Sequence, residues 1–224
     1  MRRLLVVVLI IAVVGVVFAL RGPKAPPRPG AKAAGGEAAS TAAAEPAPDP
    51  ENTTRHFSLA KGFSIALPND WQQTEQYEGT AVAAFGPAAS PTAARPTLNV
   101  VVETVPENLT IEEYFHTSQE NLGGFMRGYK QIETGDVVLA GKSARWLISS
   151  YRLGEKDFQA MAWFVINGPS AYVITCAAEP AQFPEYRQQF ETLAQSLRFE
   201  QAGDAAKPVP AAPPDAAPAA SGTS

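Results

Sequence analysis

The sequence predicts an α+β fold in which an antiparallel β-sheet is flanked by helices. Four segments with strand-like alternation follow one another between short turns that contain glycine, and this spacing is typical of an antiparallel meander. One helical segment precedes these strands and a second follows them, so strands and helices are grouped rather than regularly alternating. The four strands are expected at residues 130–139, 145–153, 157–166 and 171–177.

One β-hairpin and two more strands are expected before the first helix. The segment from His56 to Leu67 predicts a β-hairpin that turns at Lys61 and Gly62, because apolar residues alternate on either side of this turn. Pro68 ends the alternation, and Trp71 follows as a predicted core residue rather than the edge of a binding site. The other two strands are expected at residues 80–86 and 98–105.

Local sequence signals define both helices. Thr110 and Glu113 form a capping box, and Leu109 and Tyr114 are placed for a hydrophobic staple around the same helix start. Apolar residues then continue at helical spacing, and the helix is expected to end near Arg127 because two glycines weaken its last turn. The second helix is predicted over residues 183–197 and leads into a short last strand at residues 198–199.

Composition divides the chain into four parts. Residues 22–50 and 201–224 hold seven and five of the 20 prolines, are otherwise mostly Ala, Gly and Ser, and contain no aromatic residue. Such Pro/Ala-rich segments bury too little apolar surface to offset the entropy of ordering, so both are predicted to be disordered arms. Residues 51–200 have the size of one domain, and residues 1–21 form a separate N-terminal segment.

The N-terminal segment predicts a membrane address. An uncharged apolar run from Leu4 to Leu20 follows Arg2 and Arg3, and its length reaches the short end of a membrane-spanning helix. We expect a single-pass signal-anchor in the inner (cytoplasmic) membrane, with the domain exported to the periplasm or cell exterior. The alternative is a signal peptide cleaved near Ala19, which would leave a secreted or periplasmic protein.

Charge and cysteine content exclude several classes of protein. Residues 51–200 carry 11 Lys and Arg against 17 Asp and Glu, a net charge of −6, which argues against nucleic acid as a partner. The single cysteine, Cys176, excludes an intrachain disulfide and lies in an apolar run, where it is expected to be a small buried side chain. No cysteine lies near the N-terminus, so a lipoprotein is not expected.

The sequence shows no catalytic, cofactor-binding or metal-binding constellation. Its two histidines, His56 and His116, are far apart and are expected to be structural or solvated. Glu112 and Glu120 are expected on a solvated helix face, because no metal or nucleophile motif accompanies them. We therefore predict that the protein is not an enzyme and needs no cofactor.

Three further features have structural interpretations. The stretch LAGKS resembles the end of a phosphate-binding loop, but strand-like sequence follows it, so Gly141 is predicted to form a turn. Trp146 and Trp163 are expected in the core. Strand alternation places Arg145 outward.

Four segments of the domain resemble the PsbP-like superfamily, and in particular its DcrB-like bacterial envelope branch. They are Gly62 to Trp71, Gly141 to Ala144, Tyr172 to Thr175 and Phe183 to Phe199, within a resemblance that covers roughly Phe57 to Glu200. The resemblance implies an α/β/α sandwich around an antiparallel sheet, without a catalytic centre common to the superfamily.

Two functions are consistent with the anchor, the arms and this resemblance. The first is a non-enzymatic, membrane-tethered envelope protein that binds an envelope protein partner or supports a complex. The alternative is a module that binds a small ligand or a metal ion such as calcium or manganese. The resemblance implies that this alternative includes a role like that of an extrinsic subunit of photosystem II.

Overall fold

The structure is a computed structural model that describes residues 48–74, 77 and 79–200. The first part of the chain forms β1 (Thr53–Ser58), a 3₁₀ turn (Leu59–Lys61), β2 (Phe63–Pro68), β3 (Gln72–Thr74), β4 (Val82–Phe85) and β5 (Thr97–Thr104). The second part forms α1 (Ile111–Phe125), β6 (Lys130–Leu139), β7 (Lys142–Leu153), β8 (Lys156–Asn167), β9 (Ser170–Ala178), α2 (Phe183–Gln195) and β10 (Arg198–Phe199).

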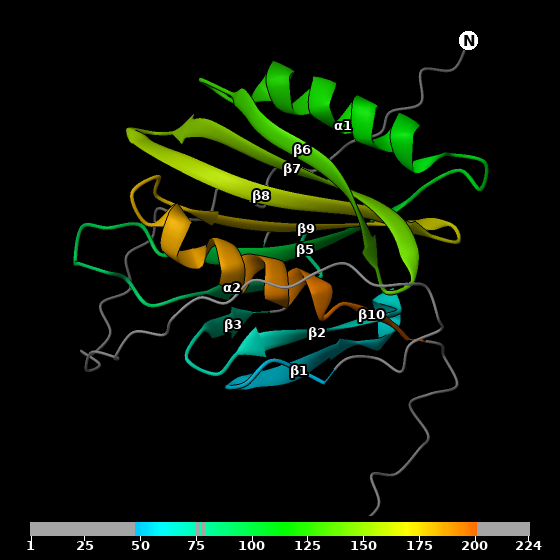
Figure 1. Cartoon of the computed structure of the whole chain (residues 1–224), viewed down its shortest axis with the longest axis horizontal. Coiled ribbons are helices and arrows are strands. Elements are labelled where there is room, and N and C mark those ends of the chain that lie inside the picture. The colour runs from blue at the N-terminus through cyan, green and yellow to red at the C-terminus, as the bar shows by residue number, and fades with distance from the viewer. Residues whose placement is uncertain (1–47, 75–76, 78, 201–224) are drawn as a thin grey trace, which may run out of the picture.

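The strands form two antiparallel sheets (Figure 1). The larger sheet has the order β3-β4-β5-β9-β8-β7-β6, and the smaller sheet has the order β1-β2-β10. Consecutive strands from β6 to β9 are paired in sequence order, so the predicted meander is confirmed. In the smaller sheet Arg198 pairs with Ser64, which brings the end of the domain beside its beginning.

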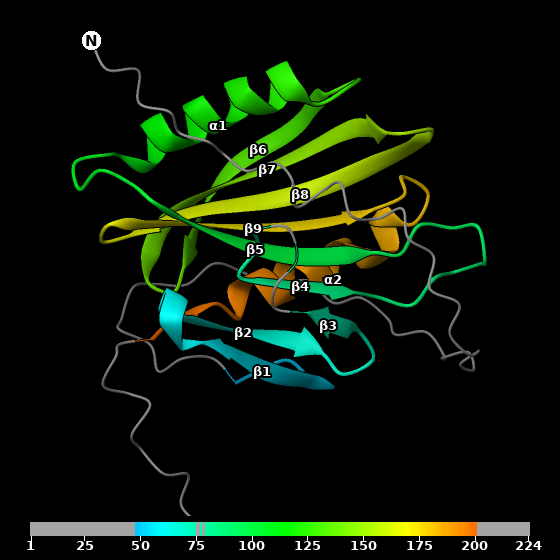
Figure 2. The same cartoon turned by 180° about the vertical axis from the view of Figure 1, so that it is seen from behind.

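The two helices pack on opposite faces of β8. On one face Met161, Trp163 and Val165 join a core cluster that includes Phe190 of α2. On the other face Ala162 and Phe164 join a second cluster, which contains the α1 residues Tyr114 and Phe115. Helix α2 accordingly crosses in front of β9 and β5 in Figure 1 and lies behind them in Figure 2. Strand β8 is therefore an interior strand of the larger sheet that is buried on both faces.

Antiparallel sheets with two helices are confirmed, but the expected single sheet is wrong. The hairpin of β1 and β2 pairs with β10 instead of joining the larger sheet, and it lies on the same side of that sheet as α2. The layer that contains α2 is therefore part helix and part sheet. Strand β3 was not predicted, because its three residues are too few to show an alternating pattern.

The helix ends follow from their local sequence. The Thr110 hydroxyl accepts a hydrogen bond from the backbone N–H of Glu113, and the Glu113 carboxylate accepts one from the backbone N–H of Thr110, which confirms the capping box. These bonds lower the pKa of the Glu113 carboxyl, the bond from the Thr110 backbone most of all. Helix α1 ends at Phe125, two residues before the expected Arg127. Helix α2 begins with a proline in its first turn, where no N–H partner is lost.

The predicted membrane segment from Leu4 to Leu20 lies outside the described residues, as do most of the Pro/Ala-rich arms. Within residues 48–200, apart from the three positions left undescribed, no helix is long and apolar enough to cross a membrane.

Candidate functional site

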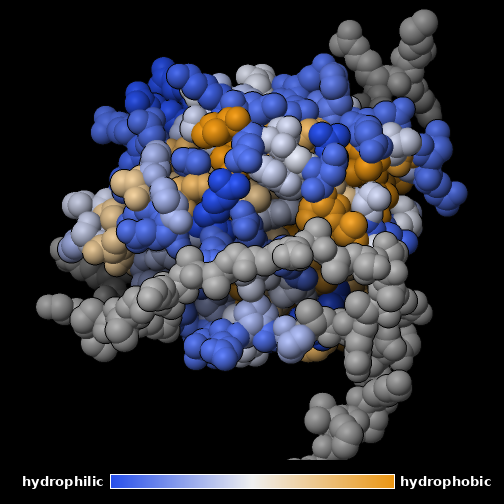
Figure 3. Space-filling view, in the orientation of Figure 1, coloured by the Kyte–Doolittle hydropathy of each residue, from blue (hydrophilic) through white to orange (hydrophobic). Residues whose placement is uncertain are grey.

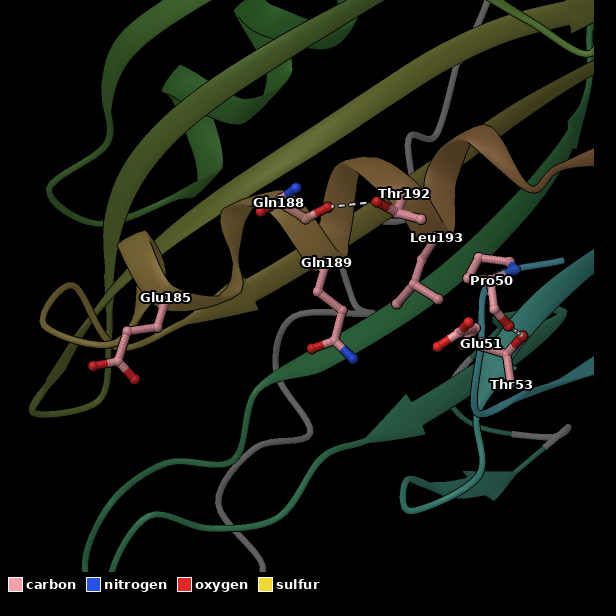
Figure 4. Close-up of a pocket in the computed structure, with 8 residues that line it drawn as sticks. All are labelled: Pro50, Glu51, Thr53, Glu185, Gln188, Gln189, Thr192 and Leu193. Carbon is pink, nitrogen blue, oxygen red and sulfur yellow. Dashed lines mark hydrogen bonds between the residues drawn. The ribbon is translucent and has the colours of Figure 1, made fainter. Parts of the chain in front are cut away.

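A groove of about 320 Å³ lies between α2 and the chain that leads into β1 (Figure 4). One wall comes from α2 and the other from the start of the domain. The lining residues are Pro50, Glu51, Thr53, Glu185, Gln188, Gln189, Thr192 and Leu193.

Helical periodicity explains which side chains of α2 form one wall of the groove. Phe190 is buried in the core and the buried Leu193 lies at the base of the groove, while the side chains at positions 185, 188, 189 and 192 lie on the outer part of the helix. Their spacing of i, i+3, i+4 and i+7 forms one continuous polar face. The Thr192 hydroxyl donates to the backbone carbonyl of Gln188 at 2.8 Å, so the hydroxyl is tied to its own helix (Figure 4).

The facing wall is a turn held by backbone and side-chain contacts. The Thr53 hydroxyl donates to the Pro50 carbonyl at 2.6 Å, a bond that Figure 4 shows beside Glu51. Asn52 has a positive φ of 58°, a backbone conformation that asparagine tolerates better than most residues. Its carbonyl accepts the backbone N–H of Asn69 at 3.0 Å, which fastens the turn to the end of β2. The wall is thus fixed from two sides.

A charged network next to this turn joins the two ends of the domain. The Arg55 guanidinium, only 9% exposed, forms an ion pair with Asp49. It also donates to the Ser64 hydroxyl at 2.9 Å and to the Ser196 carbonyl at 3.1 Å. Arg198 forms a second ion pair with Asp49 at 3.0 Å. The hydrogen bond from Arg55 is the main reason that the pKa of Asp49 is lowered. The first and last described segments of the domain therefore lie close together.

The groove has a polar lining with two carboxylates. Its lining combines the carboxylates of Glu51 and Glu185 with side-chain amides and hydroxyls, and it includes no histidine, cysteine, lysine or arginine. Carboxylates accept hydrogen bonds and attract cations, whereas amides both donate and accept. Such a surface can bind a chain with basic or amide side chains.

The residues that the sequence singled out for possible chemistry do not line the groove. His116 is 73% exposed on α1 and lies 3.7 Å from Glu120, so its expected solvated position is confirmed. Cys176 is fully buried, and burial raises the pKa of its thiol well above the ordinary value, which confirms a structural side chain. Gly141 lies in the turn between β6 and β7, as predicted, with a φ of 74°.

The predicted tryptophans have unequal burial. Trp71 and Trp163 are 5% and 2% exposed and belong to the cluster under α2, as expected. Trp146 is only partly buried at the edge of that cluster.

Arg145 was predicted to point outward, but its side chain is partly covered by α1. Its guanidinium lies over the Phe115 ring at 4.6 Å and 2.6 Å from an Asp136 oxygen, and its side chain is 26% exposed. Helix α1 covers this face of β7, which alternation along a single strand could not reveal.

Sequence reasoning did not find the groove residues. The polar stripe of α2 was visible as helical spacing, but nothing in the sequence connects it with Pro50, Glu51 and Thr53, which lie far away in the chain.

Among the residues described, no group of three or more His, Cys, Asp or Glu side chains could hold a metal ion.

The fold and the groove define a small antiparallel α+β domain with a polar groove on its surface. The model of the DcrB family matches residues 63–196, which is more than half of the chain. The protein belongs to the DcrB family, and the resemblance noted in the sequence is confirmed.

Two solved structures share this fold. Cyanobacterial PsbP (CyanoP) from Synechocystis is similar with a TM-score of 0.52 and 14% sequence identity, over 66% of this chain and 92% of its own. LpqN of Mycobacterium tuberculosis, which is involved in cell envelope biogenesis, is similar with a TM-score of 0.51 and 14% identity, over 62% of this chain and 83% of its own. At this level of identity the likeness shows the fold alone. No curated protein matches the sequence.

Proposed function

We propose that this protein is a non-enzymatic, membrane-tethered envelope protein whose domain binds a protein partner through the groove between α2 and the start of β1. The observation that carries the proposal is the groove itself, with its fixed walls and a polar lining that bears two carboxylates. Membership of the DcrB family supports an envelope role, as does the shared fold with LpqN, a protein of cell envelope biogenesis.

The position of the groove fits a tethered domain. Pro50, the last residue of the predicted N-terminal linker, lines it. In the proposal, Leu4 to Leu20 anchors the protein in the inner membrane and residues 22–50 are the tether. A partner in the groove would therefore be held beside the attachment point of the tether.

The chemistry of the lining specifies the partner. Glu51 and Glu185 favour a segment with lysine or arginine, while Gln188 and Gln189 can pair with its backbone amides. We expect a basic, extended segment of another envelope protein. A nucleic acid is not expected, because the same carboxylates repel phosphates.

Site-specific crosslinking tests this function. A photoreactive amino acid replaces Gln189 in the groove of the full chain, and the matched control replaces Glu112, which is exposed on α1 across the sheet. After irradiation of intact cells, position 189 should give one discrete crosslinked protein that position 112 does not give. Identical products at both positions, or none at position 189, would refute a partner site in the groove.

The ion- or ligand-binding alternative has its own test. A metal or small ligand that binds only the folded state raises the midpoint of thermal unfolding. The proposal predicts no shift with calcium, manganese or small anions at concentrations well above those of the protein. A saturable shift with any of them would favour the alternative.

A further inference from the structure

Strand β6 forms an open edge of the larger sheet. It lies at one end of the strand order, and within the described residues it pairs only with β7. The strand is ten residues long, whereas β3, at the opposite edge, has three. An edge strand of this length presents a row of backbone N–H and C=O groups to any strand that comes beside it.

Exposed apolar side chains accompany this edge. Ile132 and Val138 of β6 are 54% and 67% exposed, and Phe125, at the end of α1 shortly before β6, is 79% exposed. In Figure 3 apolar surface interrupts the hydrophilic surface on the right of the view, the side toward which β6 and β7 curve in Figure 1. Ile132 and Val138 are therefore apolar positions that a strand pairing with this edge could contact.

Two carboxylates of β6 are already paired within the domain. The Glu133 carboxylate lies 3.4 Å from Arg187 of α2, and the Asp136 carboxylate lies 2.6 Å from Arg145 of β7. These ion pairs reduce the repulsion that either carboxylate would exert on an identical strand. A bulge between Gln131 and Glu133 leaves Ile132 outside the regular ladder with β7.

The centre of β6 has no side chain. A Cβ atom at Gly135 would lie 2.6 Å from the Trp146 ring nitrogen, so this position is restricted to glycine by the packing of Trp146. In an antiparallel pair related by a two-fold axis, one residue must lie opposite itself. A glycine can take that central position without a side-chain clash.

The sequence of β6 selects this register among the alternatives near its centre. A centre at Glu133 or Asp136 would place like charges directly opposite each other, which is destabilising. A centre at Thr134 would place Ile132 opposite Asp136. With Gly135 at the centre, Thr134 lies opposite Asp136, so a hydroxyl can donate to a carboxylate. The bulged Ile132 lies at the level of Val138, so apolar groups meet.

We propose that the β6 edge is a self-association surface, on which β6 of a second copy pairs antiparallel about Gly135. The larger sheet then continues through both copies. The proposal is independent of the groove, which lies on α2 and the start of β1.

Cysteine crosslinking in the full-length protein tests the register. Two differently tagged copies, one carrying Ile132→Cys and the other Val138→Cys, are co-expressed and mildly oxidised in their membranes. The native Cys176 is fully buried and should contribute only background crosslinking. The mixed pair should crosslink much more strongly than either variant alone, because only the mixed pair is directly opposed. Mixed crosslinking no stronger than that of the single variants would overturn the proposal, and strong self-crosslinking of Thr134→Cys would overturn its register.

A charge substitution tests the surface without cysteine chemistry. Val138→Lys places a lysine beside Ile132 at two positions in the paired ladder and removes the apolar contact there, so it should weaken dimerisation roughly tenfold or more, measured by sedimentation of the detergent-solubilised full chain. The matched control is Phe57→Lys on β1, which is 56% exposed and away from β6, and it should leave the dimer unchanged. A monomeric wild type, or equal effects of both variants, would overturn the proposal.

Discussion

Replacing Trp71 with alanine should destabilise the domain by about 3–5 kcal/mol, the usual cost of truncating a large buried aromatic residue. The side chain is 5% exposed and meets Tyr186 and Phe190 of α2 edge-to-face, with ring centroids 6.4 Å away in each case. Such aromatic pairs contribute about 0.5–1.5 kcal/mol each beyond area burial. A Cβ at Gly86 would lie 2.9 Å from the indole, which shows how closely the chain packs around the ring.

Urea unfolding of the full chain, followed by far-UV circular dichroism, measures this loss as a change in the free energy of unfolding. Trp71→Phe is the matched variant and should lose clearly less, because it keeps an aromatic ring against α2. A loss below about 1 kcal/mol for Trp71→Ala would contradict the packing account. A folded, fully stable variant that no longer binds its partner would instead place Trp71 in a binding site.

Two further predictions concern a close contact and the pH dependence of stability. Gly135→Ala should cost about 1–3 kcal/mol, because its Cβ would lie 2.6 Å from Trp146, and urea unfolding would contradict this if the variant matched wild type. The pKa values of Asp49 and Glu179 are lowered from 3.8 and 4.5, for Asp49 chiefly by its bond from Arg55 and for Glu179 chiefly by its bond from the Ala94 backbone. Each carboxylate therefore stabilises the folded state at a pH above its ordinary pKa. This stabilisation is lost as the pH falls through the lower pKa that the group has in the folded state. Stability measured by urea unfolding should decline in that acidic range, and Asp49→Asn should make the decline shallower; an equally steep decline would contradict this assignment.

The sequence predicted the parts of the fold that depend on neighbouring residues. The capping box at Thr110 and Glu113 acts over one helical turn, and the meander from β6 to β9 consists of strands joined by short turns. Alternation therefore placed all four strands to within three residues of their observed ends.

Features that depend on distant contacts were not predictable in the same way. The pairing of Arg198 with Ser64 joins β10 to β2 in the smaller sheet, and no local sequence pattern encodes this pairing. The Arg145 guanidinium contacts the Phe115 ring because α1 folds back over β7. The groove requires that α2 approach the turn at Pro50 and Glu51, so only the tertiary structure reveals it.

The measurement that tests the proposed function most directly is partner recovery with a charge-reversed groove. The variant Glu51→Lys/Glu185→Lys keeps the core intact, because both side chains are exposed. Crosslinking from position 189 in intact cells should lose the specific partner in this variant while its thermal unfolding midpoint stays near that of wild type. Recovery of the same partner in equal yield from a folded variant would contradict the account.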